Sequence, residues 1–298
     1  MIVCSLAFGA NFLNAQEKPG IIIQDLSLLK NLDGKIVEQK MVKLKSGWSD
    51  KVECYKIKYL NDRLKVIGFL LKPKVEGTKF PVMIYNRGGN LDFGKISEGT
   101  LGYLSYLASN NYVVLASQYR GNDGGEGREE FGGRDVNDVL NLIPLARSLP
   151  FTAPDKIVML GYSRGGMMTY LAIKRGAEIK AAAVVGGLID IEQVYVEREE
   201  GMKNVIKELV GMKESAWRER SVYYWPEKIN VPLLILHGGE DWRVKVSQAK
   251  KLSEKLKELG REHELVIFPK GDHGLDTHRE ERNKKIFEWF AKYLLGVQ

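Results

Sequence analysis

Cysteine and histidine are scarce in this sequence. The 298 residues include two cysteines, Cys4 and Cys54, and no C-x-x-C pair, which excludes a disulfide framework and a cysteine-based zinc site. The histidines all lie toward the C-terminal end: His237, His263, His273 and His278. None has the i, i+4 spacing with an intervening Glu that a metalloprotease helix requires. We therefore expect no metal site, and any catalytic histidine must be one of these four.

Long apolar runs are also missing beyond the first residues. No later stretch reaches the roughly eighteen uninterrupted apolar residues that span a bilayer, so we expect no membrane association of the mature chain. Residues 2–15 form an apolar run that ends in a small residue but lacks a positively charged opening. We interpret residues 1–16 as a truncated signal peptide, which predicts a periplasmic or secreted protein. The alternative is a buried N-terminal strand in a cytoplasmic protein.

Charge and composition exclude two further classes of protein. The net charge is +7, yet 45 Lys and Arg residues are interspersed with 38 Asp and Glu residues. This mixture is typical of a solvated surface, so we expect no nucleic-acid partner. A hydrophobic content of 44% is enough for a large core and excludes global disorder. We expect a single domain over residues 17–298, and the oligomeric state stays open.

The hydrophobic pattern predicts an α/β fold. Alternating runs at 52–59 and 64–71 flank a short polar link and predict an antiparallel hairpin. After Pro81, short apolar runs typical of strands buried on both faces alternate with helical patterns. The expected strands are 82–85, 112–116, 156–160, 181–185, 233–236 and 264–268, and the expected helices are 99–109, 135–148, 164–175, 246–259 and 280–295. This order predicts a doubly wound, mostly parallel sheet, with residues 190–230 as a helical cap over the site.

The strongest chemical signal is a G-x-S-x-G motif at residues 161–165, directly after a predicted buried strand and before a predicted helix. In a nucleophile elbow the serine occupies a strained turn, where side chains two before and two after would collide with neighbouring backbone. Gly161 and Gly165 avoid that collision. The motif predicts Ser163 as a nucleophile, and a simple turn between strand and helix is the alternative.

Serine needs a base to take its proton and an acid to orient that base. Asp241 lies in a polar loop after the strand 233–236, and His273 lies in a loop after the strand 264–268. We predict Asp241 as the acid and His273 as the base. The order Ser163, Asp241, His273 is the one found in α/β-hydrolases.

Each of these assignments has an alternative. His237 could serve as the base, although it precedes the acid loop. Glu240 or Asp190 could replace Asp241 as the acid. Asp272 is adjacent to His273, and adjacent side chains diverge, which argues against it as the acid.

An oxyanion hole requires two donors directed at one point. The first is usually the N–H of the residue after the nucleophile, here Arg164. The second should come from the loop at residues 86–90, where Gly88 and Gly89 let the backbone approach a substrate. We predict the N–H of either glycine as the second donor, with a plain glycine turn as the alternative.

Taken together, the motifs resemble the catalytic domain of the prolyl oligopeptidase family of serine peptidases, from about Pro81 to the C-terminus. The stretches that carry the resemblance are the glycine-rich loop 119–127, the acidic pair Asp135 and Asp138, the elbow 161–166, the acid loop 237–244 and the His-Gly pair 273–274. The resemblance implies an α/β-hydrolase fold. It also implies cleavage of an ester or amide bond through an acyl-enzyme, without a cofactor.

The sequence departs from the family in two places. Many family peptidases carry an N-terminal β-propeller, for which the residues before Pro81 are too few, so we expect none in this sequence. Many also place a tyrosine hydroxyl or a His-Gly-Gly loop at the oxyanion hole, where this sequence has Arg87-Gly88-Gly89. We expect a peptidase-like enzyme acting on short peptides. A carboxylesterase acting on small esters is the alternative, followed by a non-catalytic binding protein of the same fold.

Overall fold

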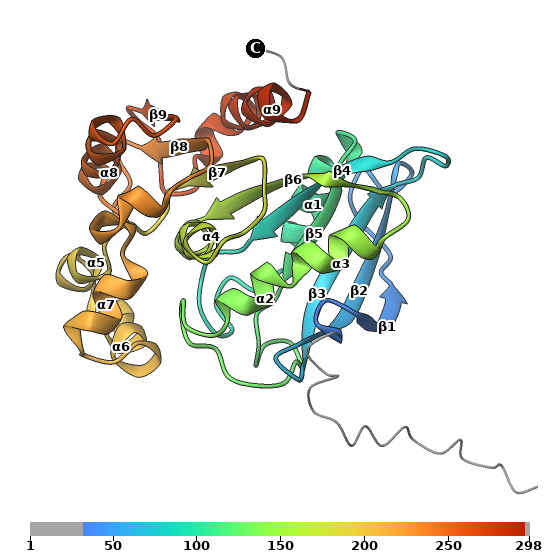
Figure 1. The fold of residues 1–298 in the computed structure, drawn as a ribbon, viewed down its shortest axis with the longest axis horizontal. Coiled ribbons are helices and arrows are strands. Elements are labelled where there is room, and N and C mark those ends of the chain that lie inside the picture. Colours follow the sequence, from blue (N-terminus) through green and yellow to red (C-terminus); the bar gives the residue numbers. More distant parts are fainter. Residues whose placement is uncertain (1–31, 296–298) are drawn as a thin grey trace, which may run out of the picture.

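The computed structural model describes residues 32–295 (Figure 1). The signal-peptide interpretation of residues 1–16 and the residue Cys4 lie outside this range. Within it, no helix is both long and apolar enough to cross a membrane, and no cluster of three or more potential metal ligands occurs.

A nine-stranded sheet runs through the described residues in the order β1-β2-β3-β5-β4-β6-β7-β8-β9. Its strands are β1 (Ile36–Met41), β2 (Val52–Asn61), β3 (Leu64–Pro73), β4 (Phe80–Asn86), β5 (Val113–Ser117), β6 (Thr152–Tyr162), β7 (Ala181–Val185), β8 (Leu233–Gly238) and β9 (His263–Phe268). Pairings from β1 to β5 are antiparallel, and those from β5 through β4 to β9 are parallel. The predicted α/β-hydrolase fold, with a mostly parallel sheet and antiparallel N-terminal strands, is confirmed.

At the N-terminal edge of the sheet, the sequence predicted the hairpin but not the first strand. The β2–β3 hairpin turns at Asp62 and Arg63, which have φ values of 49° and 65°. A two-residue type I′ turn requires positive φ at both of these positions. Strand β1 was not predicted. Its side chains are almost all exposed, so its sequence carries no apolar alternation that would reveal a strand.

Helices cover both faces of the sheet and enclose two separate cores. On one face lie α1 (Glu98–Ser109) and α9 (Arg279–Leu295). On the other lie α2 (Val136–Leu140), α3 (Leu142–Ser148), α4 (Arg164–Lys174) and α8 (Val246–Glu258). The sequence predicted one helix over 135–148, but the structure has two, α2 and α3. Pro144 has no N–H to donate to the carbonyl of Leu140, which explains the break.

The stretch predicted as a helical cap consists of short helices grouped together at the left of Figure 1. They are α5 (Ile191–Glu197), α6 (Glu200–Leu209), α7 (Glu214–Arg220), η2 (Val222–Tyr224) and η3 (Pro226–Lys228). Val194 of α5 and Met202 of α6 line the same cavity as Ser163. The helices α5 and α6 therefore form part of the wall of the candidate site.

Candidate active site

Ser163 lies in the turn between β6 and α4, with φ 54° and ψ −121°. A non-glycine residue rarely adopts this conformation, and such strain is common at functional sites. The flanking glycines are necessary for it: a Cβ on Gly161 would lie 2.3 Å from the oxygen of Gly165, and one on Gly165 would lie 1.9 Å from the oxygen of Asn86. The backbone N–H of Ser163 donates to Val185 at 2.9 Å, which fixes the turn against β7.

The loops after β8 and β9 bring Asp241 and His273 together. His273 Nδ1 lies 2.8 Å from Asp241 Oδ2. The other carboxylate oxygen of Asp241 accepts hydrogen bonds from the N–H groups of Arg243 and Val244 at 2.8 and 3.0 Å. Asp241 is buried, whereas the His273 side chain remains 15% exposed. Asp241 thus holds the Nδ1 side of the imidazole, while the ring still lines the cavity.

The pKa of Asp241 is held well below its ordinary value. Burial alone would raise this pKa, but hydrogen bonds from His237 and His273, the charge of His273 and the N–H of Val244 outweigh burial. Asp241 is therefore a carboxylate and only accepts hydrogen bonds. This requires the proton of neutral His273 to be on Nδ1, which leaves Nε2 able to accept a proton.

Ser163 and His273 line one cavity of about 660 Å³, called the cleft below. Among the described residues no hydrogen bond joins His273 to Ser163 Oγ, although the bond from His273 to Asp241 is formed. Hydrogen bonds between a base and its nucleophile are often long in the absence of substrate. The structure therefore brings all three predicted residues to one site, with Asp241 and His273 already hydrogen-bonded to each other.

Gly186 is part of this arrangement and was not predicted from the sequence. It follows β7 with φ 55°, and a Cβ there would lie 2.6 Å from the oxygen of His273 and 3.3 Å from Asp241 Oδ2. A side chain would therefore displace His273 and Asp241 from each other. The signal available in the sequence was the Gly186-Gly187 pair after a buried run.

The alternative residues occupy other positions. His237 is fully buried, with Nε2 2.8 Å from the oxygen of Val244 and 3.3 Å from Asp241 Oδ2. Since a carbonyl only accepts, this nitrogen carries a proton and braces the acid loop. Glu240 is exposed, and Asp190 caps the N-terminus of α5. These contacts favour none of them over Asp241 or His273.

The glycine loop after β4 lies against Ser163. A Cβ on Gly88 would lie 3.1 Å from Ser163 Cβ. Gly89 has φ 73°, and a Cβ there would lie 2.1 Å from the oxygen of Phe93. The N–H of Asn90 already donates to Phe93 at 3.0 Å. Of the N–H groups in this loop, those of Gly88 and Gly89 remain the candidates for substrate contact.

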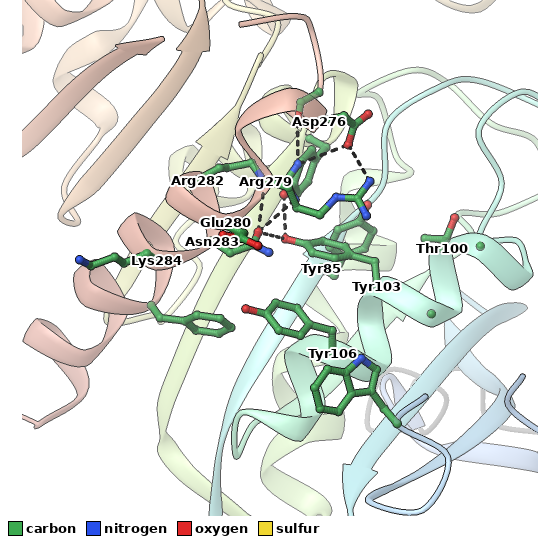
Figure 2. A pocket seen from close by; sticks show the side chains of 16 residues that line it. Tyr85, Thr100, Tyr103, Tyr106, Asp276, Arg279, Glu280, Arg282, Asn283 and Lys284 are labelled. Atoms are coloured by element: carbon green, nitrogen blue, oxygen red, sulfur yellow. Dashed lines mark hydrogen bonds and ion pairs between the residues drawn. The ribbon is translucent and has the colours of Figure 1, made fainter. Parts of the chain in front are cut away.

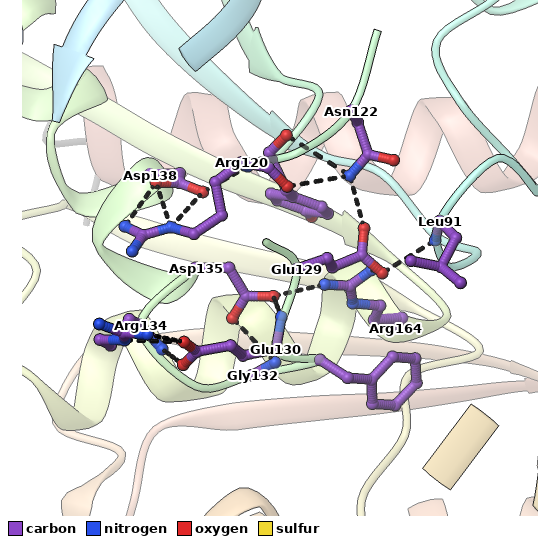
Figure 3. Close-up of polar contacts among 12 residues, drawn as sticks. Leu91, Arg120, Asn122, Glu129, Glu130, Gly132, Arg134, Asp135, Asp138 and Arg164 are labelled. Carbon is purple, nitrogen blue, oxygen red and sulfur yellow. Dashed lines mark hydrogen bonds and ion pairs between the residues drawn. The ribbon is translucent and has the colours of Figure 1, made fainter. Parts of the chain in front are cut away.

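A buried ionic cluster, composed of Arg87, Arg164, Glu129 and Asp135, supports this loop, and Figure 3 shows much of it. Arg164 lies 2.6 Å from Glu129 and 2.7 Å from Asp135, and Arg87 lies 3.4 Å from Glu129. All four side chains are at most 1% exposed. Both guanidinium groups also lie over the ring of Tyr119, at 4.9 and 4.7 Å from its centroid.

The cluster also holds the carbonyl groups of the loop. Arg87 Nη1 donates to the oxygen of Gly88 at 3.0 Å, and Arg164 Nη1 donates to that of Gly89 at 3.2 Å. The hydroxyl of Tyr119 donates to the oxygen of Arg87 at 3.0 Å. Because a trans peptide is planar, fixing each carbonyl directs the N–H of the following residue to the opposite side.

Arg120, in the glycine-rich loop 119–127, forms a second buried ion pair with Asp138 beside this cluster (Figure 3). Arg120 Nη2 lies 2.8 Å from Asp138 Oδ1, and the backbone N–H of Arg120 donates to the other oxygen at 2.7 Å. Asp135 and Asp138, which the sequence singled out together, therefore serve two different arginines.

The chain is similar to known proteins over most of its length. The model of the prolyl oligopeptidase family matches residues 101–296. A Bacillus subtilis protein named as an uncharacterized peptidase, YtmA, is 34% identical over 249 residues, or 81% of this chain and 94% of that protein. The acylamino-acid-releasing enzyme 1 of rice (Oryza sativa subsp. japonica) is 30% identical over 213 residues, or 64% of this chain and 27% of the enzyme.

Solved structures give the same result for the fold. The uncomplexed acylaminoacyl peptidase of Pyrococcus horikoshii matches with a TM-score of 0.71 and 28% identity, over 85% of this chain and 42% of that one. Acetyl xylan esterase 1 from Thermoanaerobacterium matches with a TM-score of 0.62 at 15% identity, a likeness of fold alone. The chain thus spans nearly all of the Bacillus protein but less than half of the rice and Pyrococcus enzymes.

Proposed function

Because the chain belongs to the prolyl oligopeptidase family and is a serine hydrolase, we propose that Ser163 is its nucleophile, His273 its general base and Asp241 the acid that orients the base. The observation that carries this proposal is the 2.8 Å contact between His273 and a buried Asp241, beside a serine at φ 54°. Other serines and histidines of the described chain lack this combination of backbone strain, acid partner and shared cavity.

In the proposed reaction, Ser163 Oγ attacks the carbonyl carbon of an ester or amide while His273 Nε2 takes the hydroxyl proton. His273 then gives this proton to the leaving group as the carbonyl–leaving-group bond breaks. Water attacks the resulting acyl-enzyme with the same base, and Ser163 regains its proton. Asp241 stabilises the imidazolium in both steps.

We assign stabilisation of the oxyanion to the N–H of Arg164 and to an N–H of the glycine loop. The anchored carbonyls of Arg87 and Gly88 support this, because they turn the N–H groups of Gly88 and Gly89 away from the buried side. The position of Arg164 at the start of α4 adds the favourable end of the helix dipole. These contacts support the loop as a donor without separating Gly88 from Gly89.

The substrate we propose is a short peptide. Apolar side chains line part of the cleft and suit an apolar acyl component: Phe131, Leu188, Val194, Met202 and Val205. Two relatives are named as acylamino-acid-releasing enzymes and a similar solved structure as an acylaminoacyl peptidase, which favours an amide bond next to an N-acylated residue. Hydrolysis of small esters by the same residues is the alternative function.

Labelling with a fluorophosphonate probe tests the nucleophile. We expect one modified residue, Ser163, no labelling of Ser163→Ala, and full labelling of the control Ser49→Ala, which changes a serine outside the cleft. Equal labelling of Ser163→Ala would contradict the proposal.

Paired substrates then separate the activities. We expect N-acetylphenylalanine to be released from both its anilide and its ethyl ester. Release from the ester alone would favour the carboxylesterase, whereas neither labelling nor turnover would favour a binding protein.

A further inference from the structure

A second cavity of about 930 Å³ lies between α1 and α9, beside the cleft (Figure 2). Aromatic rings line much of it: Trp48, Tyr85, Tyr103, Tyr106, Tyr162 and Phe287. Its size is within the range of small-molecule sites, and charged side chains line another part of it: Asp276, Arg279, Glu280, Arg282 and Lys284. We call it the aromatic cavity.

The aromatic cavity adjoins the proposed catalytic residues. Tyr85 and Asp276 line both this cavity and the cleft. Tyr162, which directly precedes Ser163, and Gly274, which directly follows His273, line the aromatic cavity as well. The two cavities therefore share part of their lining next to Ser163 and His273.

Its walls are already ordered by contacts among themselves. The hydroxyl groups of Tyr103 and Tyr162 are 2.8 Å apart, and their rings meet edge to face at 6.0 Å. The guanidinium of Arg282 lies over both rings, at 5.3 and 5.4 Å, and donates to the oxygen of Gly274 at 2.6 Å. The Arg282 side chain is 3% exposed. A preformed wall of this kind lowers the entropic cost of binding a ring.

The chemistry of acyl transfer decides which part of the substrate this cavity would receive. His273 must protonate the leaving group, so the leaving group departs on the His273 side of Ser163. Gly274 and Asp276, which follow His273 in the chain, line the aromatic cavity. The aromatic cavity is thus on the leaving-group side.

Resting on the proposed function, we propose that the aromatic cavity binds the leaving group of the substrate and favours an amine component with an aromatic side chain. Aromatic pairs and the burial of a phenyl ring supply the selectivity. An added amine that binds there should then intercept the acyl-enzyme. Its nitrogen attacks the acyl carbon, the bond from that carbon to Ser163 Oγ breaks, and the amine proton passes through His273 to Ser163.

The ratio of aminolysis to hydrolysis tests this inference, because both products arise from one acyl-enzyme and the ratio is independent of enzyme concentration. With an N-acetylphenylalanine ester as acyl donor, we compare equal concentrations of L-phenylalaninamide and L-alaninamide. We expect a ratio about tenfold or more higher for phenylalaninamide, as burial of a phenyl ring allows. Equal ratios for the two amines in the unmodified protein would overturn the proposal.

Two helical glycines offer matched variants. Gly102 of α1 lines the aromatic cavity, and Gly201 of α6 lines the cleft. A Cβ on Gly102 would come no closer than 3.9 Å to a neighbour, and one on Gly201 would have none within 4 Å. We expect Gly102→Leu to reduce the preference for phenylalaninamide to below about threefold. Gly201→Leu should keep this preference and alter the choice of acyl group instead.

Fluorophosphonate labelling distinguishes failure of the inference from failure of the proposed function. An unmodified protein that the probe does not label at Ser163 refutes the proposed function itself. A fully labelled Gly102→Leu that retains the preference for phenylalaninamide refutes only the aromatic cavity as the leaving-group site.

Discussion

Replacing Glu129 by glutamine tests how much the buried ionic cluster contributes to the free energy of unfolding, as distinct from its effect on catalysis. The cluster holds two arginines and two carboxylates, and Glu129 contacts both Arg164 at 2.6 Å and Arg87 at 3.4 Å. Glutamine has nearly the same shape but no charge. The variant therefore leaves one surplus positive charge among side chains that are at most 1% exposed.

The magnitude follows from that surplus charge. Removing one partner of a buried ion pair costs about 3–5 kcal/mol, a large part of the roughly 5–15 kcal/mol that stabilises a typical native protein. The neighbouring Glu130 is a matched control, because its partner Arg134 is 78% exposed. Glu130→Gln should cost less than about 1 kcal/mol. Urea unfolding measures both changes.

A double variant tests the role of the loop. Adding Arg87→Met to Glu129→Gln removes the surplus charge and should restore much of the free energy of unfolding. It also removes the donor that holds the carbonyl of Gly88. We therefore expect the kcat of the double variant to be about 10- to 1000-fold lower than that of the wild type. The largest reduction in this range is the effect of losing one oxyanion donor.

Two results would refute this reasoning. Recovery of kcat together with stability in the double variant would show that Arg87 does not position the loop. A loss of less than about 1 kcal/mol in Glu129→Gln alone, equal to that in Glu130→Gln, would show that the buried charges are not balanced as described.

Two further predictions concern Asp241 and Cys54. Asp241→Asn should lower kcat by about 10⁴-fold with the fold retained. The pKa of Asp241 is below its unfolded value near 3.9, so its ionisation stabilises the protein above about pH 4. The difference in free energy of unfolding between the wild type and this variant, measured in urea, should therefore shrink as the pH falls toward 2. A difference that stays constant with pH would contradict the assignment. Burial raises the pKa of Cys54 to about 12. In the Cys4→Ser variant, a disulfide reagent at pH 8 should therefore modify Cys54 only as urea unfolds the chain. Rapid modification without urea would contradict the burial of Cys54.

The parts of the fold that were predictable from sequence are those with a strong periodic signal. Strands buried on both faces, such as 181–185, read as continuous apolar runs, and the structure has β7 at these residues. Strand β1 has almost no buried side chain, so nothing in its sequence distinguishes it from a loop. The break between α2 and α3 was readable in principle from Pro144, but the apolar periodicity continues through it and conceals it.

The residues of the candidate site also differ in how far the sequence could predict them. Ser163, Asp241 and His273 each follow a recognisable strand, so their placement was predictable once the strands were identified. The ionic cluster was not, because Glu129 and Asp135 lie 35 and 29 residues from Arg164 along the chain, and no local pattern indicates which acid meets which arginine. Gly186 was missed for a related reason, since its function depends on what packs against it.

Arg164 links the two halves of the proposed oxyanion hole. Its backbone N–H is one assigned donor, and its side chain holds the carbonyl of Gly89 in the loop that supplies the other. The guanidinium is anchored in turn by Glu129 and Asp135 on its buried side. The Arg164 side chain therefore ties the glycine loop to the turn that contains Ser163. Lysine has a single charged nitrogen and cannot contact Gly89, Glu129 and Asp135 with the same fork. If Ser163 is the nucleophile, as proposed, Arg164 thus adds rigidity next to the proposed oxyanion hole.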